Sequence, residues 1–167
     1  GAATGSGVAS SALYLNAIGA EATYVGYKAT ANAVQDVTGR QIDFAFADVV
    51  YATGQARQGR IKMLAISSNE RSPTLPDVPT LKETTGAKTG DIVAVWGVWA
   101  PTGTPPEILR QLERWTLDIT NMPDTKKFLA DQGATPLPLN TADYKASFER
   151  ALGAWKDAVR IGKIEIQ

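Results

Sequence analysis

The sequence predicts an α/β fold with a largely parallel sheet, and three observations support this. Short apolar segments alternate with amphipathic segments of about ten residues through the first half of the chain, as in βαβ units. Turn residues such as Gly39 and Gly59 separate them. The chain has 167 residues, of which 44% are hydrophobic, so it can bury a core of ordinary size.

The first half contains three expected helices and three expected strands. Ala31, Val34 and Val37 recur at helical spacing, and Gly39 is a suitable helix terminator. Residues 4–7 read as a flexible polar loop before the first helix. We expect helices over residues 10–18, 29–38 and 48–58, and strands over residues 22–25, 42–47 and 61–67.

Proline and glycine punctuate residues 69–91, which predicts a long connection with one short helix at 80–85. Residues 92–99 follow as a strongly apolar strand, expected to be covered on both faces. Further on, an extended segment is expected over residues 134–139. The four tryptophans, at positions 96, 99, 115 and 155, are expected in the core.

The last third of the sequence is mostly helical. Thr104, Pro105 and Glu107 have the order of a capping box, which predicts a helix with Ile108, Leu112, Trp115 and Ile119 along one face. A second short helix follows Pro123 and ends near Gly133. A last helix, capped by Asn140 or Thr141, carries an apolar stripe that includes Tyr144, Phe148 and Trp155.

Composition excludes several classes of function. Seventeen basic and seventeen acidic residues give a net charge of zero, which argues against nucleic acid or anionic membrane as a partner. The absence of cysteine excludes disulfides and thiolate metal sites. The absence of histidine removes the commonest general base and metal ligand. No Ser-x-x-Lys spacing occurs either. We therefore expect no catalysis, no metal and no cofactor.

The segment from residue 4 to residue 11 is the first candidate binding site. A glycine- and hydroxyl-rich segment before a helix suits an anion, because the helix start offers free N–H groups and a partial positive charge. The alternative is an ordinary serine N-cap after a flexible terminus. The candidate ligands of a carboxylate are Thr4, Gly5, Ser6, Gly7, Ser10 and Ser11.

Two further candidates follow predicted strands. Tyr27 could form the wall of a pocket, or it could simply pack in a strand-to-helix turn. Asp48 follows the strand at 42–47, and ligands of open α/β sheets bind outside the carboxyl ends of the strands. Asp48 could equally serve only as the N-cap of the next helix, and that reading is slightly favoured.

Several motifs resemble one family of transport receptors. The segment RSPTLPDVPT at residues 71–80 closely resembles a stretch of the Bug-type solute-binding proteins, which are the receptors of tripartite tricarboxylate transporters. VGYK at 25–28, GRQIDF at 39–44 and WGVWAPTGTP at 96–105 resemble further family motifs in the same order. Gly26 stands where the family has proline, Ala9 replaces a frequent glycine, and a frequent histidine near Leu13 is absent.

The resemblance implies a type II periplasmic-binding fold with two α/β lobes and a cleft. Residues 1–94 would form a nearly complete second lobe, and residues 95–167 would return to a first lobe that is only partial. The chain would thus be an N-terminally truncated, periplasmic receptor that captures a small carboxylate for membrane permease subunits. A stripped first lobe would expose apolar edges and favour self-association. Two alternatives stay open: a cytoplasmic ligand-sensing domain of the same broad fold, and a hydrolase using a serine of residues 4–11.

Overall fold

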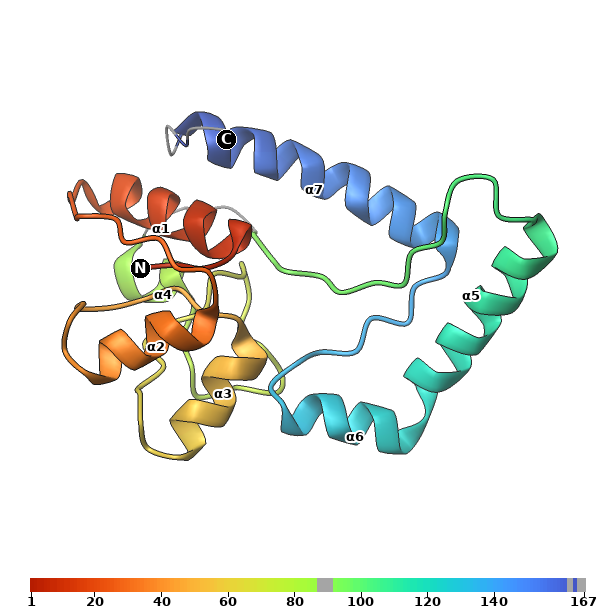
Figure 1. The fold of residues 1–167 in the computed structure, drawn as a ribbon, viewed down its shortest axis with the longest axis horizontal. Helices are drawn as coiled ribbons and strands as arrows, with labels where there is room; N and C mark the ends of the chain where they lie inside the picture. The colour runs from red at the N-terminus through yellow and green to blue at the C-terminus, as the bar shows by residue number, and fades with distance from the viewer. Residues whose placement is uncertain (87–91, 162–163, 165–167) are drawn as a thin grey trace.

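Helices dominate the computed structural model, which describes residues 1–86, 92–161 and 164 (Figure 1). Every helix predicted from the sequence is present. In the described ranges, no helix is long and apolar enough to cross a membrane. The helices are α1 (Gly5–Ile18), α2 (Thr30–Thr38), α3 (Val49–Arg57), α4 (Leu81–Thr85), α5 (Pro106–Asn121), α6 (Pro123–Asp131) and α7 (Thr141–Ile161).

The start of α1 differs from the prediction. The expected loop at residues 4–7 forms the cap and first turn of α1, which begins at Gly5 rather than at Ser10. The reason is local, because the Thr4 side chain caps the helix and makes a helical first turn favourable despite its glycines. The candidate anion site is therefore part of a helix and not a flexible segment.

The prediction of a capping box at Thr104 is wrong. The Thr104 hydroxyl donates to the carbonyl of Pro101 at 2.8 Å, and α5 begins at Pro106 without a side-chain cap. A capping box forms instead at α4. There the Thr80 hydroxyl accepts from the Glu83 amide and the Glu83 carboxylate accepts from the Thr80 amide, at 3.1 and 2.7 Å.

Segments without assigned strand structure occupy the positions of the predicted strands. They pair through isolated parallel bridges, and no longer ladder is found in the described residues. Ala2 bridges both Gly26 and Phe46, and Ile66 bridges Thr80. The parallel direction agrees with the predicted βαβ order, whereas a continuous sheet stays a prediction.

The core joins the beginning and the end of the chain. Helix α7 lies along α1 (Figure 1) and contacts it. Buried Ala9 and Leu13 of α1 meet Ile92 and Ala158, and the ring of Trp155 packs against this cluster. Part of the apolar stripe predicted for the last helix, α7, thus packs against α1.

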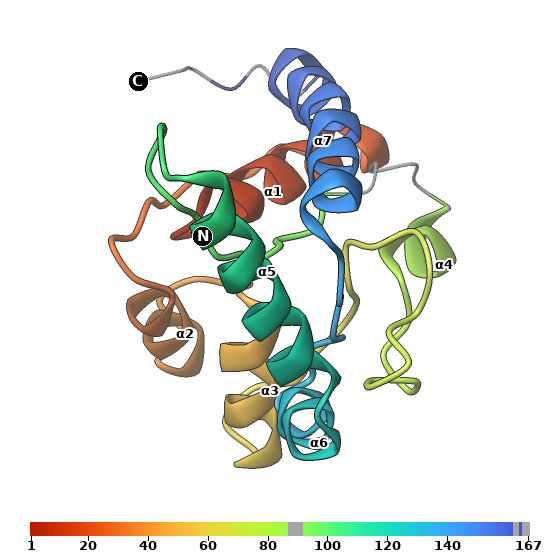
Figure 2. The ribbon, with the colours of Figure 1, turned by 90° about the vertical axis from the view of Figure 1, so that its right-hand side faces the viewer.

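The surface around α5 is less covered than the sequence predicts. Helix α5 stands away from α1 and α2 in Figure 1, lies toward the viewer in the turned view of Figure 2, and packs on α6. Trp96, Trp99 and Trp115 are 69%, 67% and 51% exposed, so the prediction that they are core residues is wrong. Residues 93–99 are all exposed rather than covered on both faces.

Candidate functional site

The first turn of α1 forms the centre of the candidate site. Thr4 is the N-cap, in an extended conformation, and its Oγ1 accepts a hydrogen bond from the Gly7 amide at 3.2 Å. The Ser6 hydroxyl lies 3.2 Å from the same oxygen. Among the described residues, no hydrogen bond uses the amides of Gly5 and Ser6. These two N–H groups and the helix dipole can therefore receive an anion.

Gly7 allows this turn to sit close to two neighbouring segments. A Cβ atom at Gly7 would stand 3.1 Å from the Ala2 Cβ and 3.2 Å from the Phe46 carbonyl oxygen. Both distances are tighter than ordinary van der Waals contact, and the Phe46 contact is with a backbone atom. Close packing thus favours glycine at this position, and the Gly7 amide is already used by the Thr4 hydroxyl.

Ser10 and Ser11 follow the first turn along α1 and are buried. They are 4% and 8% exposed, and the Ser11 hydroxyl donates to the Gly7 carbonyl at 2.8 Å. This bond uses the only proton of the Ser11 hydroxyl inside the helix. The structure therefore separates Thr4, Gly5 and Ser6, which lie at the open end of α1, from Ser10 and Ser11, which are buried.

The three predicted site segments converge at one edge. The amide of Tyr27 donates to the Ala2 carbonyl at 3.1 Å, and the Phe46 amide donates to the Gly1 carbonyl at 3.0 Å. Because all three segments run parallel, their carboxyl ends point the same way. Thr4, Tyr27 and Asp48 thus follow neighbouring segments at the same side of the molecule, as expected for a ligand site in an α/β protein.

Tyr27 uses its hydroxyl within the protein. Its Oη donates to the Asp36 carboxylate of α2 at 2.8 Å. Desolvation raises the pKa of Tyr27 above its ordinary value, and the Asp36 carboxylate raises it further. The phenol therefore stays protonated and is held toward α2, so Tyr27 can offer a ring wall to a ligand.

Asp48 is the N-cap of α3. Its Oδ1 accepts from the amides of Val50 and Tyr51, at 2.9 and 3.3 Å. The capping role that the sequence slightly favoured is therefore present. One oxygen of the carboxylate is thereby occupied, and the side chain is half-buried.

Trp155 is a neighbour of the site that sequence reasoning did not identify. A Cβ atom at Gly5 would lie 3.9 Å from the outer edge of its indole ring, in ordinary contact. The residues are 150 positions apart in the chain, and only the packing of α7 on α1 brings them together. No local signal in the sequence distinguishes Trp155 from the other apolar residues of its helix.

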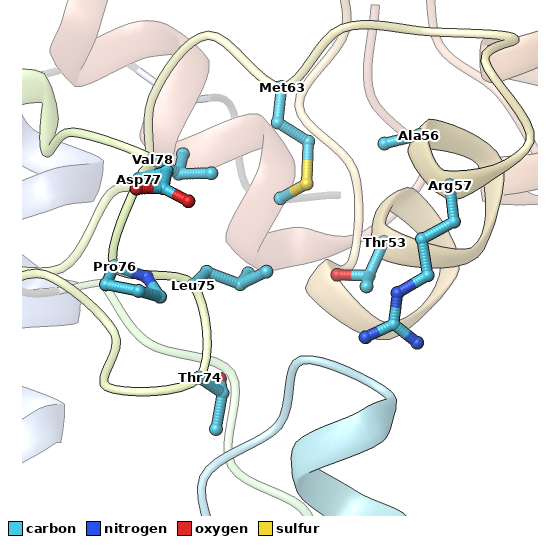
Figure 3. Close-up of a pocket in the computed structure, with 9 residues that line it drawn as sticks. All are labelled: Thr53, Ala56, Arg57, Met63, Thr74, Leu75, Pro76, Asp77 and Val78. Atoms are coloured by element: carbon cyan, nitrogen blue, oxygen red, sulfur yellow. The ribbon is translucent and has the colours of Figure 1, made fainter.

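A cavity of about 310 Å³ lies elsewhere, between α3 and the segment at residues 74–78 (Figure 3). Met63 and Leu75 point into it, and its lining is mainly apolar. None of the predicted site residues lines it. The lining residues are Thr53, Ala56, Arg57, Met63, Thr74, Leu75, Pro76, Asp77 and Val78.

In the described ranges, no cluster of three acidic side chains is suited to a metal ion. The α1 turn offers backbone amides and hydroxyls, which are neutral donors of the kind that bind anions at helix N-termini.

Comparison with known proteins places the chain in a family. The profile of the tripartite tricarboxylate transporter family receptor matches residues 1–161. Protein BugT of Bordetella pertussis is 28% identical over 143 residues, which cover 85% of this chain and 43% of BugT. A protein from Agrobacterium vitis is 30% identical over 145 residues, covering 83% of this chain and 42% of its own length.

Solved structures agree with this result. R. palustris Rpa4515 with adipate matches with a TM-score of 0.86 and 26% identity, over 95% of this chain and 53% of that one. MatC from Rhodopseudomonas palustris with bound malate matches with a TM-score of 0.75 and 28% identity, over 92% of this chain and 53% of MatC. The chain thus spans about half the length of these structures.

These matches confirm the periplasmic-binding-protein fold and the resemblance seen in the motifs. The family consists of receptors rather than enzymes, as predicted from the missing catalytic residues. This chain belongs to the tripartite tricarboxylate transporter receptor family, of which the Bug proteins are members.

Proposed function

We propose that this chain supplies one wall of the ligand site of a periplasmic receptor that captures a small carboxylate. One observation carries the proposal. The amides of Gly5 and Ser6 have no hydrogen-bond partner among the described residues, and they lie at the N-terminus of α1, beside the segments that lead to Tyr27 and Asp48. A carboxylate there would accept two amide hydrogen bonds and gain from the helix dipole.

Each predicted site residue takes a distinct role in this proposal. The amides of Gly5 and Ser6 and the Ser6 hydroxyl bind the carboxylate, and Thr4 holds the turn in its capped form. Gly7, Ser10 and Ser11 support the turn from below. The Tyr27 ring bounds the pocket, and Asp48 fixes the start of α3 at its far side.

The remaining expectations belong to the same proposal. Residues 1–94 form the second lobe, residues 95–167 return to the first lobe, and the extended segments are strands of a parallel sheet flanked by helices. Closure of the two lobes buries the ligand and presents a surface to membrane permease subunits. The adipate and malate bound in two relatives support dicarboxylates as the first ligands to test.

The decisive variant is Gly5→Pro, because it removes one N–H group with little other change. Proline is favoured at the first position of a helix, and the residue before it must be extended. Thr4 meets that requirement, with φ −119° and ψ 155°. Gly5→Ala is the matched control, since it adds a side chain at the same site but keeps the N–H group.

Isothermal titration of the full-length receptor with mono-, di- and tricarboxylates would measure the effect. A hydrogen bond to a charged group contributes about 1.5–3 kcal/mol, so Gly5→Pro should weaken binding by about 10- to 100-fold. Gly5→Ala should bind nearly as tightly as the parent. Equal affinities for both variants, or no binding of any carboxylate by the parent, would refute the proposal.

A further inference from the structure

Trp155 lies beside the N-terminal end of α1. Gly5, Ala9 and Leu13 are spaced four residues apart, so they share one face of that helix. Ala9 and Leu13 belong to the buried cluster against which the partly buried Trp155 packs. The outer edge of the indole reaches Gly5, where the Cη2 and Cζ3 atoms lie 3.9 and 4.0 Å from the position of a Cβ atom. An apolar ring edge therefore borders the turn whose amides are the proposed carboxylate donors.

Two hydroxyls border the same turn on a different side. The Thr4 Oγ1 and Ser6 Oγ atoms are 3.2 Å apart. Because successive residues of an α-helix are about 100° apart around its axis, the Ser6 side chain and a Cβ atom at Gly5 point in different directions. The amides of Gly5 and Ser6 thus lie between an apolar flank, formed by the Trp155 ring edge, and a polar flank, formed by the Thr4 and Ser6 hydroxyls.

Two unlike flanks distinguish ligands by the group next to the bound carboxylate. The edge of an aromatic ring carries a partial positive charge, so the indole tolerates a carboxylate beside it, and it also packs well against a methylene. A hydroxyl on the α-carbon finds partners on the polar flank, whereas on the apolar flank it loses its hydrogen bonds to water and gains none. Once both carboxylates of a ligand are held, the configuration of the α-carbon decides which flank its hydroxyl meets.

We infer that Trp155 makes the carboxylate site select the handedness of 2-hydroxy dicarboxylates. The favoured ligands are dicarboxylates whose α-carbons are unsubstituted, or carry a hydroxyl in the one configuration that turns it toward Thr4 and Ser6. Trp155 determines this specificity, because backbone amides alone hold a carboxylate of either configuration equally well. The inference rests on the proposed carboxylate site and adds a residue of α7 to it.

The test uses succinate and the two enantiomers of tartrate as ligands of the full-length receptor. Each enantiomer of tartrate has the same configuration at both of its α-carbons, so reversing it end to end does not change which flank its hydroxyl meets. Isothermal titration should show that succinate binds, and that one tartrate binds at least about ten-fold more tightly than its mirror image. The ratio of the two dissociation constants is the readout, because a general loss of stability weakens the binding of both enantiomers alike.

Trp155→Phe is the decisive variant. Phenylalanine keeps an aromatic ring on the cluster of Ala9 and Leu13 but removes the outer indole atoms beside Gly5, so that water reaches a hydroxyl on that flank. The ratio for the two tartrates should fall to within about three-fold of one, while the affinity for succinate changes by less than about three-fold. Trp115→Phe is the matched control, because Trp115 is 51% exposed on α5 and should leave the ratio at the parent value.

Thermal unfolding without ligand establishes that each variant is folded, and Trp155→Leu is a second replacement that also removes the outer ring atoms. Equal binding of the two tartrates by the parent, or an unchanged ratio in the folded Trp155 variants, would overturn the inference.

Two further results separate the inference from the proposed function. Binding of succinate and of neither tartrate would show that the polar flank accepts no hydroxyl, and binding of other carboxylates only would overturn the ligand class. Either result leaves the carboxylate site in place. A parent that binds no carboxylate at all, or a Gly5→Pro variant that binds as tightly as Gly5→Ala, would instead refute the proposed function, and the inference with it.

Discussion

Gly133 lies directly against Thr53, so close that a Cβ atom on the glycine would overlap the threonine Oγ1. The Gly133 carbonyl also accepts a hydrogen bond from the Thr74 hydroxyl at 2.9 Å. The Arg57 guanidinium of α3 donates to the carbonyl of Asp131 in the same turn. The end of α6 is thereby joined to α3 and to the long connection, far from either in sequence.

Gly133→Ala should destabilise the protein by about 2–4 kcal/mol. The residue has φ +78°, which costs a side chain about 1–2 kcal/mol, and the overlap with Thr53 adds an overpacking term. Gly59→Ala is the control, because Gly59 has φ +70° but nothing within 4 Å. Urea unfolding of both variants measures the difference, and equal losses would show that the Thr53 contact contributes nothing.

Leu13→Ala should cost about 2–5 kcal/mol, because Leu13 is 6% exposed within the cluster between α1 and α7. Leu64→Ala should change the free energy of unfolding by less than about 0.5 kcal/mol, since its side chain is 65% exposed. Chemical denaturation of the two variants tests whether this cluster is the main core. A small effect at Leu13 would place the stabilising contacts elsewhere.

Asp48→Ala should lower stability by about 1 kcal/mol through loss of the α3 cap. Asp48→Asn should retain most of the stability that the cap provides, because the side-chain amide oxygen can still accept from the backbone amides of Val50 and Tyr51. Thermal unfolding compares the variants. If asparagine were as damaging as alanine, the carboxylate charge rather than its capping oxygen would be the stabilising feature.

Glu83 should make stability depend on acid pH. The amide of Thr80, and then the Arg71 guanidinium, hold the pKa of Glu83 below its ordinary value of 4.5. Such a carboxylate stabilises the folded state above 4.5, and this contribution is lost as pH falls through the lower pKa of the folded protein. The free energy of unfolding of Glu83→Gln should therefore differ most from that of the parent near neutral pH.

Urea midpoints of parent and Glu83→Gln, measured from neutral to strongly acid pH, would test this. The difference between the two proteins should shrink as the pH falls below about 4.5, where the unfolded-state carboxyl binds its proton. A difference that stays constant over this range would mean that the Thr80–Glu83 pair contributes no pH dependence.

The helices could be predicted because their signals are local. Apolar spacing placed α2 and α7, and a terminating glycine followed α2. The residues around Thr104 did not show whether a capping box would form there. The Thr104 hydroxyl instead donates to the nearby Pro101 carbonyl. Thr80 and Glu83 have the same pattern, and there the box forms.

The anion site at residues 4–11 stays a prediction, and its detail depends on tertiary packing. Hydroxyls and glycines before a helix predict such a site. That Ser11 is buried and bonded to Gly7, and that the Tyr27 hydroxyl is bound by Asp36, depends on how the turn packs on its neighbours. The residues alone predicted Trp96 and Trp99 in the core, because an apolar side chain carries no local sign of its exposure. The family resemblance, which implies a partial first lobe, was the signal that implied exposed apolar edges.

The sequence by itself determined the order of the helices, the absence of histidine and cysteine and, through its motifs, the receptor family. Only the tertiary structure decided that Thr4, Tyr27 and Asp48 follow parallel neighbours at one edge, and that Trp155 borders Gly5. The physical reason is range. Caps and periodicity act within a few residues, whereas parallel pairing and helix packing join segments separated by tens of residues or more.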